Sequence, residues 1–432
     1  MSSILIKNWE IADFENFVFK KSDILIEENK IVKISESIDL SADKIIDAKN
    51  NTIIPGIIDL GVRFREPGLE QEATIRSESK AAASSGVTTV AYLPDTNPII
   101  DTAGQVKFVQ DLFSNVKLCK VKVISAATKN LNGEQITSMM SLKSAGAIGV
   151  DNTNNKYKNT LIMRRVMEYA SGCELTFFYH PLDYDLSNNG CYHEGSISAK
   201  LGLPGIPAAA ESIAVTQAIE LSKLTNSKLH ICRVSCKDSL DIIHHYISKG
   251  YNVSYDIAVN QLFFSENSIS EYDTNFHVIP PYRSENDMLA LINDISSSDN
   301  LSLCSDHQPH NNDAKQKPFP ESKSGVSCIE ILFPLLMSLV DSGKINVFDA
   351  IKKITLNPAN VIGFDNYGLK EGSPADIAIF GKEKWIYTRE NTISAGKNIP
   401  FNNFEFSHKI KYTICDGDIV YTDKVWIILV QI

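Results

Sequence analysis

The feature that most constrains the fold is a repeated alternation of short apolar strands and helical segments through the middle of the chain. The strands end near Phe64, Pro94, Ala127, Val150, His180, Arg233, Ile257 and Asp306. Helical patterns fall between most of them, for example at 78–85, 135–145, 208–224 and 237–249. Eight strands with intervening helices fit a (β/α)₈ barrel, in which functional groups gather at the carboxyl ends of the strands.

Antiparallel strand patterns occupy both ends of the chain. Residues 23–34 hold two apolar strands and a polar turn, which is a β-hairpin pattern. Similar strand patterns return at 375–380, 412–414 and 419–421. We therefore expect an α/β protein in which residues 1–54 and 360–432 form one small β-sandwich-like domain and residues 55–359 form a TIM-type barrel.

Charge and hydropathy narrow the class of function. The 432 residues include 52 acidic and 42 basic side chains, and the net charge of −10 argues against nucleic-acid binding, which needs a basic surface. The apolar stretch 425–432 is too short to span a bilayer and predicts a terminal strand, so no membrane partner is expected. The first residues lack the pattern of a signal peptide, which favours a cytoplasmic protein.

The eight cysteines form no CxxC pair and no regular framework. In a large chain without a secretion signal, this distribution predicts reduced and mostly buried thiols. Cys232 and Cys236 remain candidates for soft metal ligands, although two thiols alone do not make a zinc site.

The residues that follow the predicted barrel strands are the candidates for a functional site. They are Gly61 and Arg63 after the first strand, Asp95 after the second, Asp151, Asn152 and Thr153 after the fourth, His180 after the fifth, Arg233 after the sixth, and Asp306, His307 and His310 after the eighth. Each alone is more often structural, but together at one face of a barrel they indicate an active site or its remnant.

Several motifs resemble those of dihydroorotases in the amidohydrolase superfamily, over about residues 3–421. They are PGIID (55–59), REPG (65–68), GVTTV (86–90), TNP (96–98), PPYR (280–283), DHQPH (306–310), NPA (357–359), GSPADI (372–377) and KNIPF (397–401). Within the family, HEG (193–195), LGLPGIP (201–207) and DLGV (59–62) look most like the non-catalytic dihydroorotase-like subunits. Those subunits assemble with aspartate carbamoyltransferase, and the resemblance implies that partner here.

The resemblance also implies where metal ligands would lie. Active members of the family use a His-x-His pair on the first strand, an acidic bridging residue after the fourth, histidines on the fifth and sixth, and an aspartate after the eighth. The matching positions here are Gly61, Arg63, Asn152, His180, Arg233 and Asp306, with Asp151 a possible substitute at the fourth strand. Guanidinium stays protonated and has no lone pair to donate, so the two arginines cannot ligate a metal. His180 and Asp306 are thus remnants, and no metal cofactor is expected.

The substrate-contacting positions of the family are only partly kept. Arg65 and His310 match residues that hold the dihydroorotate carboxylate, whereas Asp95 stands where the family has an asparagine. An anionic Asp95 would repel a carboxylate substrate. Arg65 also has a purely structural interpretation, a strand-end salt bridge with Glu66 or Asp59.

Three hypotheses about function follow. The leading one is a scaffold in pyrimidine biosynthesis that has lost its chemistry, binds the catalytic chain of aspartate carbamoyltransferase and forms a homo- or hetero-oligomer. In it Asp306 is a relict general base, ion-paired with two arginines that replace the charge of the metals. The second is a working cyclic-amide hydrolase whose His180, Asp306, His307 and His310 bind one zinc ion. The third is a sensor that binds an anion through Arg65 and His310.

Overall fold

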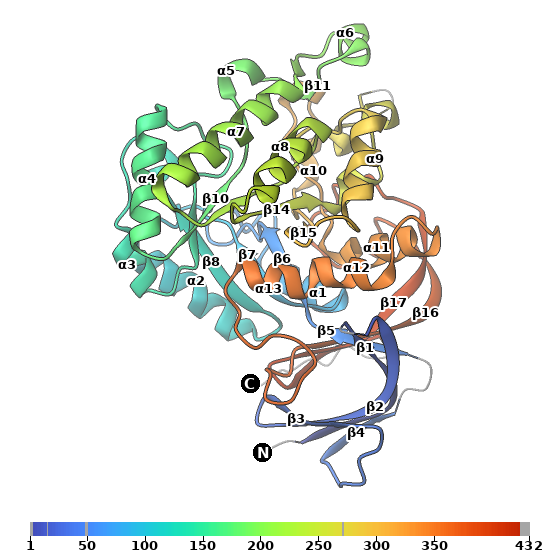
Figure 1. Ribbon diagram of the computed structural model, residues 1–432. Coiled ribbons are helices and arrows are strands. Elements are labelled where there is room, and N and C mark those ends of the chain that lie inside the picture. Colours follow the sequence, from blue (N-terminus) through green and yellow to red (C-terminus); the bar gives the residue numbers. More distant parts are fainter. Residues whose placement is uncertain (1–2, 15, 48–50, 270–271, 424–432) are drawn as a thin grey trace.

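The computed structural model describes residues 3–14, 16–47, 51–269 and 272–423. It contains a barrel surrounded by helices and a separate β-module, to which both ends of the chain contribute (Figure 1). This is the α/β architecture predicted from the strand and helix patterns. The predicted strand at 425–432 lies outside the described residues.

The barrel is a sheet of eight parallel strands in the order β15-β14-β13-β10-β9-β8-β7-β6. The strands are β6 (Ile57–Val62), β7 (Val87–Tyr92), β8 (Lys120–Ala126), β9 (Gly149–Asp151), β10 (Thr176–Tyr179), β13 (Leu229–Ile231), β14 (Val253–Ala258) and β15 (Leu301–Cys304). A parallel bridge between Val62 and His307 nearly closes the ring. The backbone N–H of Arg63 donates to the His307 carbonyl at 2.9 Å there. Closure brings the first and last strand ends, and the residues after them, to one place.

An outer layer of helices covers the barrel (Figure 1). It includes α1 (Ile75–Ser84), α2 (Ala103–Val116), α3 (Met139–Ser144), α4 (Thr160–Gly172), α7 (Ala208–Thr225), α8 (Lys237–Ser248), α9 (Glu285–Asp294), α11 (Leu332–Asp341), α12 (Val347–Ile354) and α13 (Leu356–Val361). Side-chain caps fix several starts; Thr74 and Thr102, for example, form capping boxes at α1 and α2. Smaller elements project beyond the strand ends, namely α5 (Tyr184–Ser187), β11 (Tyr192–His193), α6 (Ser196–Leu201), β12 (Gly205–Ile206) and α10 (Asn312–Lys315).

Alternate residues of each strand pack on opposite sides of the barrel wall. On β10, Phe177 belongs to the core between the strands and the helices, whereas Phe178 belongs to the barrel interior. The interior side chains Ile58, Leu60 and Ile124 are apolar and fully buried. Side chains of this kind fill much of the barrel, as in other barrels of this type.

The β-module is one hydrogen-bonded sheet in the order β18-β17-β16-β5-β1-β2-β3, with β4 paired to β1. Its strands are β1 (Ile4–Asp13), β2 (Val18–Glu27), β3 (Lys30–Ser35), β4 (Lys44–Asp47), β5 (Thr52–Pro55), β16 (Ile377–Tyr387), β17 (Phe404–Cys415) and β18 (Asp418–Thr422). The sheet curls around an isoleucine-rich core that contains Trp9. The predicted hairpin is present as β2 and β3, and the two chain ends meet where β5 pairs with β16.

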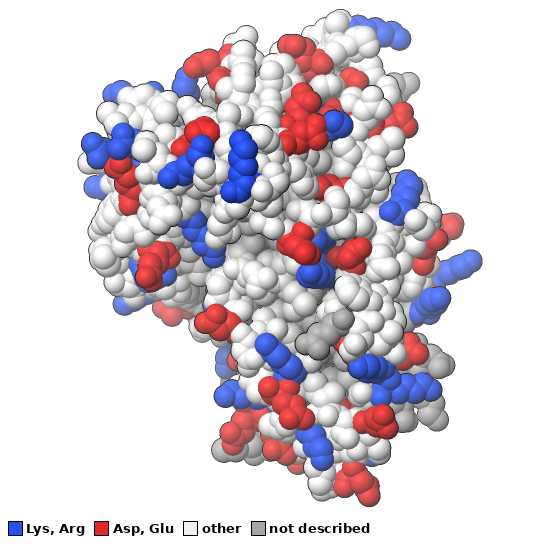
Figure 2. All heavy atoms as spheres, in the orientation of Figure 1, with Lys and Arg blue, Asp and Glu red and all other residues white. Residues whose placement is uncertain are grey.

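All eight cysteines are free and buried, as the sequence predicted. Among the described residues, no helix is long and apolar enough to cross a membrane. On the face shown in Figure 2, basic and acidic side chains are interspersed and form no continuous basic surface.

Candidate functional site

Asp306, the predicted relict base, lies between two arginines at the centre of the barrel mouth. Its Oδ1 is 3.1 Å from Arg233 Nε and 3.6 Å from Arg63 Nη1. Gln308 Nε2 donates to the other oxygen, Oδ2, at 3.0 Å. The expected ion pairs of Asp306 with both arginines are thus present, and both oxygens of this carboxylate are engaged.

Two further carboxylates complete the cluster. Arg63 Nε donates to Asp95 Oδ2 at 2.6 Å, and Arg233 donates to Asp256 from its backbone N–H at 2.8 Å and from Nη1 at 3.2 Å. Burial alone would lower the pKa of Arg63, but Asp95 and Asp306 outweigh it and raise that pKa. Burial likewise opposes the charge of Arg233, but the neighbouring anions, Asp256 foremost, raise its pKa well above the ordinary value. Both guanidinium groups are therefore firmly protonated.

Gly61 is the position that makes room for Arg233. A Cβ built on Gly61 would lie 1.7 Å from Arg233 Nη2 and 2.4 Å from its Cζ. The guanidinium therefore occupies the volume that a side chain at residue 61 would need. Arg233 can adopt this position only because residue 61 is a glycine.

The strand-end backbone is held in an uncommon conformation at this site. Arg65, Thr153, Arg233 and Asp306 all have positive φ angles, of 68°, 46°, 56° and 47°. Non-glycine residues adopt such angles at a cost that the surrounding structure has to offset, and they cluster at functional sites.

At the ends of β9 and β10, only some of the predicted residues face the centre. Asp151 Oδ2 lies 3.2 Å from His180 Nε2, and both side chains are buried. The side chain of Asn152 is turned aside, with its Oδ1 accepting from Thr128 at 2.6 Å. Thr153 contributes its backbone N–H to Asp151 Oδ1 at 2.8 Å. Asp151 is therefore the carboxylate that approaches His180, and Asn152 is not.

These residues do not fit the metal centre that the resemblance implies. Of the six positions, Gly61 has no donor, Arg63 and Arg233 are protonated, and Asn152 bonds elsewhere. Asp306 is engaged by both arginines. His180 and Asp151 remain, whereas a catalytic zinc normally takes three protein ligands.

Three buried potential metal ligands lie close together in the barrel, but the histidine and the carboxylate among them already have hydrogen-bond partners. His230, Cys232 and Asp256 bring donor atoms within 4.8 Å of one another. His230 contacts Ser254 at 2.8 Å through Nδ1 and Asp256 at 3.0 Å through Nε2, and Arg233 holds Asp256. Cys236, the other candidate thiol, contacts Ser239 at 3.1 Å instead.

Arg65 and His310, which match the family's carboxylate-binding pair, are engaged by an internal carboxylate that sequence reasoning missed. His310 Nδ1 lies 2.7 Å from Glu72 Oε2, and Arg65 Nε lies 3.7 Å from the same oxygen. Arg65 also donates to the Pro309 carbonyl at 2.9 Å. Burial would raise the pKa of Glu72, but hydrogen bonds from His310 and Lys323 outweigh it and lower that pKa to about 2. Arg65 therefore pairs with Glu72, and the expected salt bridge with Glu66 or Asp59 was the wrong one.

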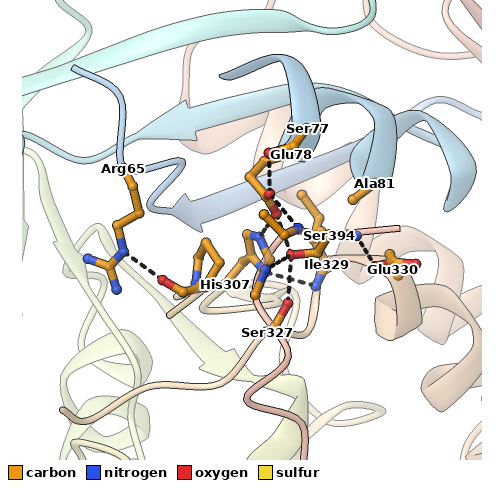
Figure 3. A network of polar contacts seen from close by, with 12 residues as sticks. Arg65, Ser77, Glu78, Ala81, His307, Ser327, Ile329, Glu330 and Ser394 are labelled. Carbon is orange, nitrogen blue, oxygen red and sulfur yellow. Dashed lines mark hydrogen bonds and ion pairs between the residues drawn. The ribbon is translucent and has the colours of Figure 1, made fainter. Parts of the chain in front are cut away.

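His307 is not part of the barrel mouth, which corrects its assignment as a metal ligand. Its Nε2 lies 2.8 Å from Glu78 Oε2, while Nδ1 accepts from the backbone N–H of Cys328 at 3.1 Å. Figure 3 shows Glu78 and His307 pointing toward one another, with Ser394 beside them. Ser394 Oγ donates to Glu78 at 2.6 Å. This network joins the residues that follow β15 to α1 and to the segment 388–403, which connects β16 to β17.

Comparison with known proteins agrees with this architecture. The structure superposes on an L-hydantoinase (dihydropyrimidinase) from Arthrobacter aurescens with a TM-score of 0.88 at 20% identity, over 98% of this chain and 96% of that one. A dihydropyrimidinase from Brevibacillus agri gives a TM-score of 0.85 at 20% identity, over 98% and 96%. The fold is therefore the one that these hydantoinase and dihydropyrimidinase structures have.

Sequence comparison is more specific. A family model described as dihydro-orotase-like matches residues 50–239. A dihydroorotase from Caldanaerobacter subterraneus subsp. tengcongensis is 35% identical over 420 residues, which is 97% of each chain. A protein from Pseudomonas putida named dihydroorotase-like protein is 31% identical over 420 residues, covering 97% of this chain and 99% of that one. This chain belongs to the dihydroorotase family.

Proposed function

We propose that the chain is a non-catalytic dihydroorotase-like subunit of pyrimidine biosynthesis that serves as a scaffold for the catalytic chain of aspartate carbamoyltransferase. The observation that carries the loss of catalysis is the position of Arg233. Its guanidinium fills the space beside Gly61 and, together with Arg63, holds Asp306. Arg63 and Arg233 supply the positive charge that a metal centre would otherwise supply, but their side chains cannot activate water.

The chemistry of cyclic-amide hydrolysis explains why this arrangement matters. Such a reaction needs an activated water, a polarised carbonyl and a base positioned to take a proton. Asp306 is the base that the resemblance implies, and its oxygens are bonded to Arg233 and Gln308. Both oxygens of Asp306 are thus occupied by other side chains, and neither is left free to take up a proton from a bound water. The cluster therefore favours a structural role.

The substrate-contacting residues support the same conclusion. Glu72 contacts His310 and Arg65, the pair expected to bind a substrate carboxylate. Asp95 adds a second fixed anion beside Arg63. A dihydroorotate carboxylate would have to displace one internal carboxylate and approach another.

The partner assignment rests on the sequence resemblance of HEG (193–195) and LGLPGIP (201–207). In the structure these motifs border α6 and form the small pair β11 and β12, which extends away from the barrel (Figure 1). The relative from Pseudomonas putida that carries the name dihydroorotase-like protein also supports the family branch. An element that projects from the barrel is suited to contact another chain.

A hydrolase with one metal ion is the second candidate, and one observation favours it. Asp151 Oδ2 and His180 Nε2 lie 3.2 Å apart, and among the described residues neither atom makes a hydrogen bond. The test is to assay the purified full chain for dihydroorotate hydrolysis with added zinc, and to run it with aspartate carbamoyltransferase on size exclusion. A scaffold shows no hydrolysis and co-elutes. Hydrolysis that His180→Ala abolishes would establish the one-metal enzyme instead.

A further inference from the structure

A second feature of the strand ends is a polar cavity of about 240 Å³ that is lined in part by Asp151 and His180. It lies at the ends of β9 and β10 and reaches outward to α4, α5 and α7. Its lining includes Asp151, Tyr157, His180, Asp183, Tyr184 and Gln217. A cavity of this volume has room for a small organic molecule.

The cavity contains buried polar atoms that the described part of the chain leaves without hydrogen bonds. They are Tyr157 Oη, Tyr184 Oη, and the pair Asp151 Oδ2 and His180 Nε2, which lie 3.2 Å apart without making a hydrogen bond. The side chains of Asp151 and His180 are 1% and 8% exposed. Buried polar atoms are nearly always paired in folded proteins, so four such atoms around one cavity indicate a ligand that bonds to them.

Charge indicates the kind of ligand. The two lysines of the lining are engaged at its rim, Lys156 with Asp185 at 2.5 Å and Lys158 with Glu134 at 3.2 Å. Among the described side chains, Arg63 and Arg233 form their ion pairs with carboxylates other than Asp151. The charged-group contact of Asp151 at the cavity is with His180. An ionised carboxylate only accepts hydrogen bonds, and a phenol both donates and accepts. The lining thus favours a cation with N–H donors and one oxygen.

We propose that this cavity binds a small primary amine that also carries a hydroxyl or carbonyl oxygen. The ammonium donates to Asp151 Oδ2 and to His180 Nε2, and the oxygen bonds to the hydroxyls of Tyr157 and Tyr184. The site goes beyond the scaffold role and does not depend on the partner.

The test uses three probes of similar length that differ in charge: 4-amino-1-butanol, 1,4-butanediol and 4-hydroxybutyrate. Each is titrated calorimetrically into the full chain, whose zinc content is measured on the same sample. We expect the amino alcohol to bind at least tenfold more tightly than the diol and the hydroxy acid not to bind. Equal binding of all three, or of none, would overturn the proposal.

Variants locate the site. Tyr157→Phe and Tyr184→Phe each remove one hydroxyl, and we expect each to weaken amine binding severalfold, while Asp151→Asn abolishes it. Tyr246→Phe, whose hydroxyl bonds to Glu220 outside the cavity, is the matched control and leaves binding unchanged. Unchanged binding in both cavity variants would overturn the assignment even if Asp151→Asn fails to fold.

A metal ion is the competing occupant. Stoichiometric zinc that His180→Ala removes would assign the unpaired atoms to a metal and overturn the amine site. Absence of amine binding in zinc-free protein would also overturn it, while leaving the scaffold proposal intact. Hydrolysis of dihydroorotate would overturn the scaffold proposal alone, so the two failures are distinguishable.

Discussion

Replacing Arg233 with methionine removes the central cation while keeping a long apolar side chain. The Arg233 side chain is 1% exposed, and its partners Asp256 and Asp306 are 0% and 8% exposed. Removing one member of a buried ion pair costs about 3–5 kcal/mol, because the other charge remains buried without compensation. His230 still contacts Asp256 and Arg63 still contacts Asp306. We therefore expect a loss near the lower limit, about 3 kcal/mol.

The loss should depend on pH with a defined sign. Burial would raise the pKa of Asp256, but Arg233 and then His230 outweigh it and hold that pKa below the ordinary value. A carboxyl with a depressed pKa stabilises the fold above its unfolded pKa, about 3.9, and this contribution is lost as the pH falls further. In Arg233→Met the buried carboxyl can accept a proton instead. The difference from wild type should be largest near neutral pH and shrink below about pH 4.

Urea unfolding followed by circular dichroism measures this effect. With a slope of about 3 kcal/mol per molar, the expected loss moves the midpoint down by about 1 M. Lys237→Met is a matched control, since Lys237 forms an exposed pair with Asp241 and its removal should leave the midpoint unchanged. A midpoint shift no larger than that of the control at pH 7 would refute the reasoning.

Three further predictions concern neighbouring features. Gly61→Ala should lower stability by about 1–3 kcal/mol through overpacking, and by much less in the Arg233→Met background, which a double-mutant cycle in urea would measure. Glu72→Ala should free Arg65 and let orotate raise the melting temperature, whereas wild type shows no shift; equal responses would contradict this. Burial raises the pKa of Glu330 to about 7, so stability should fall as pH rises from about 4.3 to 7. Glu330→Gln should flatten that part of the unfolding profile.

Much of the fold could be predicted, because the spacing of apolar residues along the chain differs between strands and helices. Strand ends follow from short β-branched runs, so the predicted end at Phe64 lies two residues beyond the end of β6 at Val62. The helix predicted at 208–224 is α7, Ala208–Thr225. Local signals of this kind depend on neighbours in the sequence and need no tertiary information.

The site was only partly predictable, because its partners are distant in sequence. Asp256 is the one charged residue of β14, and a buried carboxylate there signals that a cation has to pair with it, although not which one. Glu72 gave no such signal, since a surface loop of a soluble protein commonly carries glutamates. His307 was wrongly expected at the mouth, because the DHQPH motif does not reveal that its ring faces Glu78.

Zinc content per chain is the measurement that tests the central claim most directly. The full chain would be purified without an affinity tag in the presence of zinc, dialysed and measured by elemental analysis. We expect a value near zero, because Arg63 and Arg233 supply the positive charge beside Asp306. One or more tightly held zinc ions per chain would contradict it.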